Sequence, residues 1–172
     1  LIIDLIQLAR IESRQEIFEA EALELGNILL DSIESFAPVA ESKSLDLQLE
    51  APKTLSMRGD AEGIRTILDN LISNAIRYTP DGGTVNVKCM ATDAVVQLEI
   101  RDTGIGIAKE HRARIFERFY RIDKARSRDL GGTGLGLSIV KHLAQALNGT
   151  IEVESEIGRG SCFRVTLPLN IE

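Results

Sequence analysis

Residues 60–83, DAEGIRTILDNLISNAIRYTPDGG, form the most regularly patterned segment of the chain. Apolar residues recur in it at intervals of three and four, the period of a helix with one buried face. They are Ile64, Ile67, Leu68, Leu71, Ile72, Ala75 and Ile76. Asp60 is a suitable N-cap, and Pro80 with the following Asp81-Gly82-Gly83 ends the pattern. We therefore predict a core helix that begins after Asp60.

The other side of this helix carries Asn70 and Asn74, one turn apart, followed by Arg77 and Tyr78. A solvated helix face explains such a stripe in most proteins. Asparagine, however, is a weaker helix former than the residues usually found at exposed positions. Amide oxygens can ligate a hard cation without adding charge, which leaves room for Mg²⁺ that already carries phosphates.

Around this helix the sequence alternates between strand-like and helix-like patterns. We predict helices at 25–42 and 136–147, and strands at 45–49, 55–57, 84–90, 95–101, 150–154 and 162–167. Residues 45–57 are expected to form a hairpin, and a short helical stretch is expected at 110–119. This order favours an α/β (α+β) two-layer sandwich, with a mixed, largely antiparallel sheet and helices on one face.

Two glycine-rich segments interrupt the pattern between residues 103 and 136. Asp102-Thr103-Gly104-Ile105-Gly106 directly follows a predicted strand. It is either an ordinary polar turn or a site where the carboxylate accepts hydrogen bonds from an exocyclic amine such as that of adenine. Gly131-Gly132-Thr133-Gly134-Leu135-Gly136 opens a helix, so it is either a flexible hinge or a phosphate-binding helix start. Walker A, dinucleotide-binding and protein-kinase signatures are missing.

Composition excludes several classes of protein. The net charge of −6 argues against a nucleic-acid binder, and the longest apolar runs are far shorter than the roughly 20 residues that span a bilayer. Cys89 and Cys162 are far apart and are expected in core strands rather than in a zinc site. The chain starts with Leu1 inside an amphipathic pattern, which suggests a fragment of a longer protein.

Five ordered motifs carry a family resemblance: NLISNAIRYTPDGG, DTGIGI, IFERFYR, GGTGLGLSIVKH and SEIGRGSCFRVTLP. Their order and spacing resemble the N, G1, F, G2 and terminal boxes of the bacterial sensor histidine kinase ATP-binding domain. The resemblance implies the Bergerat-type ATP-binding fold shared with gyrase, MutL and heat-shock chaperone ATPases. It also implies a catalytic ATP-binding domain at 16–172, preceded at 1–15 by the end of a dimerisation and phosphoacceptor helix with its linker.

Position by position, the resemblance implies a site for ATP and Mg²⁺. The implied nucleotide-binding residues are Asn70, Asn74, Arg77, Tyr78, Asp102, Gly104, Gly106, Ile107, Arg118, Arg121, Gly132, Thr133, Gly134, Leu135, Gly136 and Leu137. Asn74 would ligate Mg²⁺ and, with Asn70, form the catalytic pair. Asp102 would take the adenine amine, and Arg77 would neutralise phosphate charge while Tyr78 closes the site.

Residues 107–131 would form a mobile lid over the nucleotide. Arg118 and Arg121 either reach the γ-phosphate or are simply solvated. Phe116 and Phe119 either pin the lid to the domain or to a neighbouring helical domain, or pack in the core. The two histidines, His111 and His142, do not lie in a phosphoacceptor setting, so we expect this chain to bind ATP without phosphorylating itself.

The implied partners lie outside this chain. They are a phosphoacceptor-histidine domain of the same protein, a response regulator receiver domain and a second copy in a homodimeric full-length protein, with no nucleic acid. The chain would be the cytoplasmic domain of a membrane-anchored sensor.

Two alternatives remain open. The first is a relative that hydrolyses ATP to drive a conformational change, although such relatives carry Glu where this chain has Asn70, and an amide activates water poorly. The second is a nucleotide-free interaction module that has kept the fold. The retained Asn74, Asp102 and glycines speak against it.

Overall fold

A computed structural model describes residues 21–52, 54–122 and 132–170. The elements in chain order are β1 (Glu21–Glu24), α2 (Leu25–Ser42), β2 (Asp46–Glu50), β3 (Ser56–Gly59), α3 (Ala61–Tyr78), β4 (Thr84–Ala91), β5 (Val95–Asp102), the 3₁₀ helices η1 (Lys109–His111) and η2 (Arg114–Phe116), α5 (Gly136–Ala146), β6 (Thr150–Glu156) and β7 (Gly160–Pro168). The expected helix end and linker at residues 1–15 lie outside the described residues.

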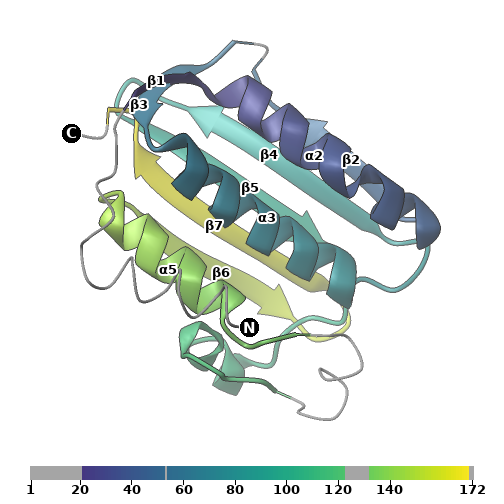
Figure 1. Cartoon of the computed structure of the whole chain (residues 1–172). Helices are drawn as coiled ribbons and strands as arrows, with labels where there is room; N and C mark the ends of the chain where they lie inside the picture. The colour runs from purple at the N-terminus through teal and green to yellow at the C-terminus, as the bar shows by residue number, and fades with distance from the viewer. Residues whose placement is uncertain (1–20, 53, 123–131, 171–172) are drawn as a thin grey trace.

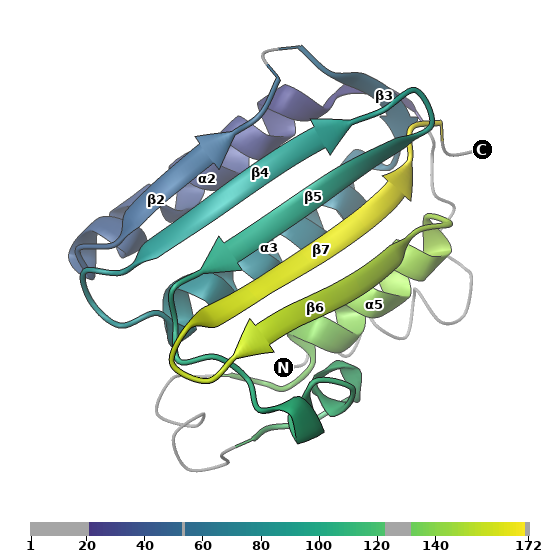
Figure 2. The same ribbon diagram turned by 180° about the vertical axis from the view of Figure 1, so that it is seen from behind.

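The main sheet has five strands in the order β2-β4-β5-β7-β6. Among its described strands, the β2–β4 pair is parallel and the other three pairs are antiparallel. In the described part of the chain, the helices α2, α3 and α5 cover one face of this sheet and the other face is left open (Figures 1 and 2). The predicted two-layer α/β sandwich, with a mixed and largely antiparallel sheet, is therefore confirmed.

The core lies between the sheet and the three helices. In β5, Val96, Leu98 and Ile100 alternate with more exposed residues and are completely buried. All seven apolar positions predicted for α3 are at most 4% exposed. The periods of two and 3.6 residues thus bring the apolar faces of strands and helix into one continuous core.

Both ends of α3 are capped by side chains. The Asp60 carboxylate accepts a hydrogen bond from the Glu62 amide at 3.1 Å, as an N-cap should. At the other end, Lys43 Nζ donates to the carbonyl oxygens of Ile76 and Thr79 at 2.7 Å each. A lysine at this position satisfies terminal carbonyls and opposes the negative end of the helix dipole. The caps fix where α3 begins and ends, and its buried apolar side determines which way its polar side faces.

The predicted hairpin at residues 45–57 is wrong. β2 pairs in parallel with β4, with Leu47 opposite Val85, whereas β3 pairs with β1 in a separate two-stranded sheet. Alternation identified both strands, but it does not encode which partner a strand takes. Here α3 supplies the crossover that a parallel pair requires, so β2 is free to join β4.

The short helical stretch predicted around residues 110–119 is confirmed in part, because two three-residue 3₁₀ helices, η1 and η2, lie between residues 109 and 116 and the rest is not helical. Ile115 is buried, but Phe119 is 54% exposed and has a φ of +61°. Glu117 is extended, with a ψ of 145°, and Phe119 is left-handed, so helical geometry ends after Phe116. The remaining predicted helices and strands are present, with boundaries shifted by no more than two residues.

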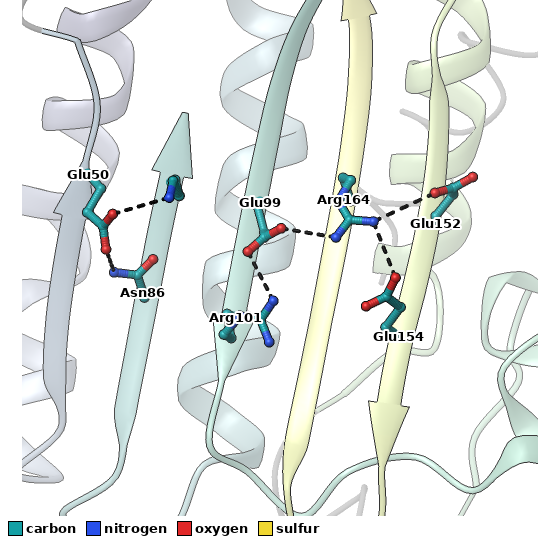
Figure 3. Close-up of polar contacts among 8 residues, drawn as sticks. Glu50, Asn86, Glu99, Arg101, Glu152, Glu154 and Arg164 are labelled. Carbon is teal, nitrogen blue, oxygen red and sulfur yellow. Dashed lines mark hydrogen bonds and ion pairs between the residues drawn. The ribbon is translucent and has the colours of Figure 1, made fainter. Parts of the chain in front are cut away.

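The open face of the sheet is polar. Glu99 on β5 accepts a hydrogen bond from Arg101 and another from Arg164 on β7, each at 3.2 Å, and Arg164 also reaches Glu154 on β6 at 3.4 Å (Figure 3). Burial raises the pKa of Glu99, but the two arginines outweigh it, so the net pKa lies below its usual range. The face is therefore a chain of ion pairs rather than an apolar surface.

Both cysteines are buried strand residues, as predicted. Burial raises the pKa of each thiol to about 11.

Among the described residues, none of the helices combines the length and the apolar character needed to cross a bilayer.

Candidate active site

A pocket of about 690 Å³ opens between α3, the segment that follows β5, the start of α5 and the end of the β6–β7 hairpin. In Figure 1 the C-terminal end of α3 and the N-terminal end of α5 lie on the same side of the molecule as η1 and η2. The pocket brings together most of the predicted site residues: Asn70, Asn74, Arg77, Tyr78, Asp102, Gly106, Ile107, Arg121, Gly132, Thr133, Gly134, Gly136 and Leu137.

Three predicted residues do not line this pocket. Leu135 is completely buried and belongs to the hydrophobic core. Arg118 is exposed. Gly104 lies behind Asp102, where a side chain would not fit, because a Cβ atom there would be 2.6 Å from both Asp102 Oδ1 and the Tyr78 carbonyl oxygen. Gly104 therefore shapes the pocket without forming its surface.

The polar side of α3 forms one wall. Asn70 Nδ2 donates to the Thr66 carbonyl oxygen at 2.9 Å, which fixes the orientation of its amide. The Asn70 Oδ1 atom lies against the start of α5, where a Cβ atom on Gly136 would approach it to 2.5 Å. Asn74 is half-buried, and its amide makes no hydrogen bond to any described residue. An oriented amide thus lies one turn before an amide that is free to bind a ligand.

Asp102 ends β5 and is only 6% exposed. Its Oδ1 atom accepts hydrogen bonds from the backbone amides of Gly104 at 2.8 Å and Ser161 at 3.2 Å. Burial raises the pKa of this carboxyl, and the two backbone hydrogen bonds only partly offset that effect. Because both backbone donors use the same oxygen, Oδ2 remains available as an acceptor in the pocket.

Arg121 brings a cation into the same pocket. Its Nε and Nη2 atoms are buried, and neither has a hydrogen-bond partner among the described residues. A buried guanidinium without partners is unfavourable, and its planar fork suits carboxylate or phosphate oxygens. The arrangement therefore favours an anionic ligand next to Arg121.

The glycine-rich segment enters α5 at the pocket edge. Gly134 has a φ of +75°, and its carbonyl oxygen accepts a hydrogen bond from the Phe119 amide at 2.9 Å. This bond ties together two points of the chain on either side of residues 123–131, which lie outside the described residues. The N-cap residue of α5, Leu135, makes no side-chain cap, and Gly136 and Leu137 at the helix start line the pocket, so their amides can serve an anion.

The segment before residue 123 is held by aromatic contacts. Phe116 meets Phe163 of β7 edge-on, with ring centroids 6.4 Å apart, whereas Phe119 is exposed. Of the two phenylalanines, Phe116 therefore contacts this domain and Phe119 presents an apolar surface outward. His111 Nδ1 and the Tyr120 hydroxyl are 2.7 Å apart, and the Arg114 guanidinium lies 4.3 Å from the centre of the Tyr120 ring.

Sequence reasoning missed the contribution of the β6–β7 hairpin. A Cβ atom on Gly106 would come within 2.0 Å of the Glu156 carbonyl oxygen, and the Gly158 amide donates to the Ile105 carbonyl oxygen at 2.9 Å. Ser161, also in this hairpin, lines the pocket beside Asp102. The only signal was SEIGRGS inside the terminal motif, where alternation predicts strands but not that their turn supports the segment after Asp102.

Comparison with known proteins gives a consistent result. Residues 59–171 match the family described as histidine kinase-, DNA gyrase B-, and HSP90-like ATPase. The chain is 40% identical over 172 residues to the sensor-like histidine kinase SenX3 of Mycobacterium tuberculosis (strain ATCC 25618 / H37Rv), covering all of this chain and 42% of that protein. It is 39% identical over 168 residues to the sensor histidine kinase CusS of Escherichia coli (strain K12), covering 98% of this chain and 35% of that protein.

Solved structures agree with the fold. Full-length ShkA, crystallised in complex with AMPPNP, superimposes with a TM-score of 0.87 at 29% identity, covering 98% of this chain and 35% of that one. The histidine kinase AdeS of Acinetobacter baumannii gives a TM-score of 0.82 at 27% identity, covering 98% of this chain and 77% of that one. The chain thus spans less than half the length of the curated relatives it matches.

Proposed function

The chain belongs to the histidine kinase-, DNA gyrase B-, and HSP90-like ATPase family, and from this premise we propose that it is the ATP-binding catalytic domain of a sensor histidine kinase. One observation carries the proposal: the same pocket holds the buried Asp102 carboxylate, with one oxygen free of the backbone amides, and the buried Nε and Nη2 atoms of Arg121, which have no hydrogen-bond partner among the described residues. The carboxylate suits the adenine amine, and the guanidinium suits the triphosphate.

The donors in the pocket fit a magnesium ion that is brought in by the nucleotide. Mg²⁺ prefers oxygen ligands in octahedral geometry and commonly takes one or two from the protein, with phosphates and waters completing its shell. Asn74 offers a neutral amide oxygen that no described residue uses, and Asn70 is oriented one turn earlier. The ion would neutralise phosphate charge during transfer.

The proposed reaction needs no nucleophile from this domain. The imidazole nitrogen of a histidine on a separate phosphoacceptor domain would attack the γ-phosphorus, form a P–N bond and displace ADP. Arg121, Arg77 and the amides at the start of α5 would hold the phosphate oxygens, so this chain contributes positioning and charge neutralisation. Residues 107–131 would act as the lid over the nucleotide.

Hydrolysis of ATP as the main activity is disfavoured by the side chain at position 70. The Asn70 amide donates to the backbone of its own helix and has no carboxylate with which to activate water. His111 and His142 are both engaged, with Tyr120 and with the Ser138 carbonyl oxygen respectively. The chain alone is therefore expected to form no acid-labile phosphate on incubation with ATP, and a stable phosphohistidine on it would contradict this assignment.

The proposal extends to the longer protein. Residues 1–15 would end a dimerisation and phosphoacceptor domain, and 16–172 would form the catalytic domain. The full-length protein would be a homodimer that passes phosphate to the receiver domain of a response regulator. This domain would lie on the cytoplasmic side of a membrane-anchored sensor.

Calorimetric titration with a nonhydrolysable ATP analogue, with and without Mg²⁺, tests the proposal. The wild-type chain should bind, and Mg²⁺ should tighten binding. Asn74→Ala should remove most of the Mg²⁺ effect while preserving the fold, because alanine is the better helix former. Asn27→Ala, at an exposed position of α2, is the matched control and should behave as wild type. Failure of the wild-type chain to bind would favour the nucleotide-free interaction module.

A further inference from the structure

A cluster of hydroxyl and backbone groups lies directly behind Asp102. Ser155 on β6 and Ser161 on β7 are opposite each other in the ladder, and their Oγ atoms are 2.9 Å apart. Ser155 Oγ also lies 2.9 Å from the Gly160 carbonyl oxygen, to which it donates, and accepts from the Ile107 amide at 2.7 Å. Ser155 therefore joins the first lid residue to the residue beside Asp102.

The direction of the hydrogen bonds in this cluster follows from which groups carry a proton to donate. The Gly160 carbonyl can only accept, and the Ile107 amide can only donate. A serine hydroxyl has one proton, and Ser155 gives it to Gly160. Because Ser155 has no second proton, the contact between the two hydroxyls is a hydrogen bond only when Ser161 donates, and Ser155 Oγ then accepts from both Ile107 and Ser161. The hydroxyl proton of Ser161 thus points away from the pocket.

This direction determines what Ser161 offers to a ligand. Ser161 lines the pocket and is 8% exposed, and its backbone amide is already committed to Asp102 Oδ1. With its hydroxyl proton used by Ser155, Ser161 Oγ presents only lone pairs. Asp102 Oδ2 and Ser161 Oγ are then two acceptors at one end of the pocket.

We propose that Ser155 is a positioning residue that sets purine specificity, by holding Ser161 as an acceptor so that the pocket selects a 6-amino purine over a 6-oxo purine. Two acceptors match the two hydrogens of an exocyclic amine, directly or through an ordered water. A 6-oxo purine would place its own acceptor against them and leave buried groups unpaired. The proposal rests on the nucleotide-binding function argued above and adds the residue that determines the base.

The test compares the affinities of nonhydrolysable ATP and ITP analogues by calorimetry. The wild-type chain should prefer the ATP analogue. In Ser155→Ala the Ser161 hydroxyl loses its acceptor and can turn to donate to a 6-oxo group. The ATP-to-ITP affinity ratio should therefore fall by about fivefold or more, the size expected when one buried hydrogen bond changes from mismatched to matched. Ser155→Thr keeps the hydroxyl and should keep the ratio.

Three outcomes separate this role from a structural one. If Ser155→Ala weakens both analogues equally, Ser155 only supports the fold and the proposal is overturned. In a Ser161→Ala background, Ser155→Ala should no longer change the ratio, and a persisting change would also overturn it. Should Ser155→Ala fail to fold, Ser155→Cys serves instead, because sulfur is a weak acceptor and predicts the same fall.

The same titrations distinguish failure of this inference from failure of the proposed function. A wild-type chain that binds both analogues with equal affinity retains the nucleotide site but contradicts the specificity role of Ser155. A wild-type chain that binds neither contradicts both.

Discussion

The two sides of α3 have different roles, one in the core and one in the pocket. One side packs Leu68, Leu71 and their apolar neighbours against the sheet, where they are completely buried. The other side turns Asn70, Asn74 and Arg77 toward the pocket. The apolar side packs within the core formed by the helices and the sheet. The polar side shares the pocket with segments that lie far along the chain. Stability and ligand binding should therefore separate when the two sides are changed one at a time.

The largest expected effect lies on the apolar side. Leu68→Ala should lower the free energy of unfolding by about 2–5 kcal/mol, since it removes buried methyl groups and leaves a cavity. In the fraction that remains folded, affinity for a nonhydrolysable ATP analogue should be unchanged. Chemical denaturation and calorimetry measure the two quantities. A large loss of affinity in the folded fraction would show that the two sides are coupled.

Arg121→Met should show the opposite pattern. Nucleotide affinity should fall by about 1.5–3 kcal/mol, the range for a hydrogen bond to a charged group. The free energy of unfolding should stay level or rise, because the variant removes the buried Nε and Nη2 atoms, which lack a partner among the described residues. Adenosine should lose much less affinity than the triphosphate analogue. Equal losses for both ligands would place Arg121 away from the phosphates.

Asp102→Asn should separate binding from stability at the base-recognition end. Asparagine can keep its Oδ1 acceptor for the two backbone amides but turns a donor into the pocket, so ATP-analogue affinity should fall by about 1–3 kcal/mol. Affinity for the ITP analogue should fall less or rise. Calorimetry with both analogues measures this, and an equal loss for both would contradict recognition of the base by Asp102.

The pH dependence of stability tests, without any ligand, whether the Asp102 carboxylate destabilises the fold. Burial in the folded state raises the pKa of this carboxyl. The free energy of unfolding of the wild-type chain should therefore fall as the pH rises from the ordinary aspartate pKa to the raised one. Asp102→Asn should abolish that loss and be at least as stable as wild type at neutral pH. Denaturation curves across this interval measure it. Lower stability of the variant at neutral pH would contradict the assignment.

Much of the scaffold could be predicted from the sequence because its signals are local. The period of α3, its Asp60 cap and the alternation of β4 and β5 each depend on near neighbours, and the structure contains all of them. Strand partners are not local information. The parallel pairing of β2 with β4 depends on the crossover through α3, so the expected hairpin at 45–57 did not form.

The candidate site divides in the same way. Asn70 and Asn74 stood out because asparagine is a weak helix former, and Asp102 because it begins one of the five ordered motifs; the pocket contains all three. The proton arrangement at Ser155 and Ser161 could not, since it depends on a cross-strand pair and on the Ile107 amide, 48 positions from Ser155 in sequence. The residue types of Ser155 and Ser161 alone cannot predict contacts that form only in the folded sheet.

The smallest effect is expected on the open face of the sheet, which serves as a control for both sides of α3. Glu99→Gln should cost about 1 kcal/mol or less at neutral pH, because partly exposed ion pairs contribute little. The net pKa of Glu99 is lowered, so the contribution is present above the ordinary glutamate pKa and disappears as the pH falls through the lowered one. Nucleotide affinity should not change. A change would link this face to the pocket.

The most direct test of the central claim is a crystal structure of the chain with Mg²⁺ and a nonhydrolysable ATP analogue. The account predicts the adenine amine within hydrogen-bonding distance of Asp102 Oδ2, the metal bound to the Asn74 amide oxygen and phosphate oxygens at the Arg121 guanidinium. A base bound away from Asp102, or a metal coordinated without Asn74, would contradict it.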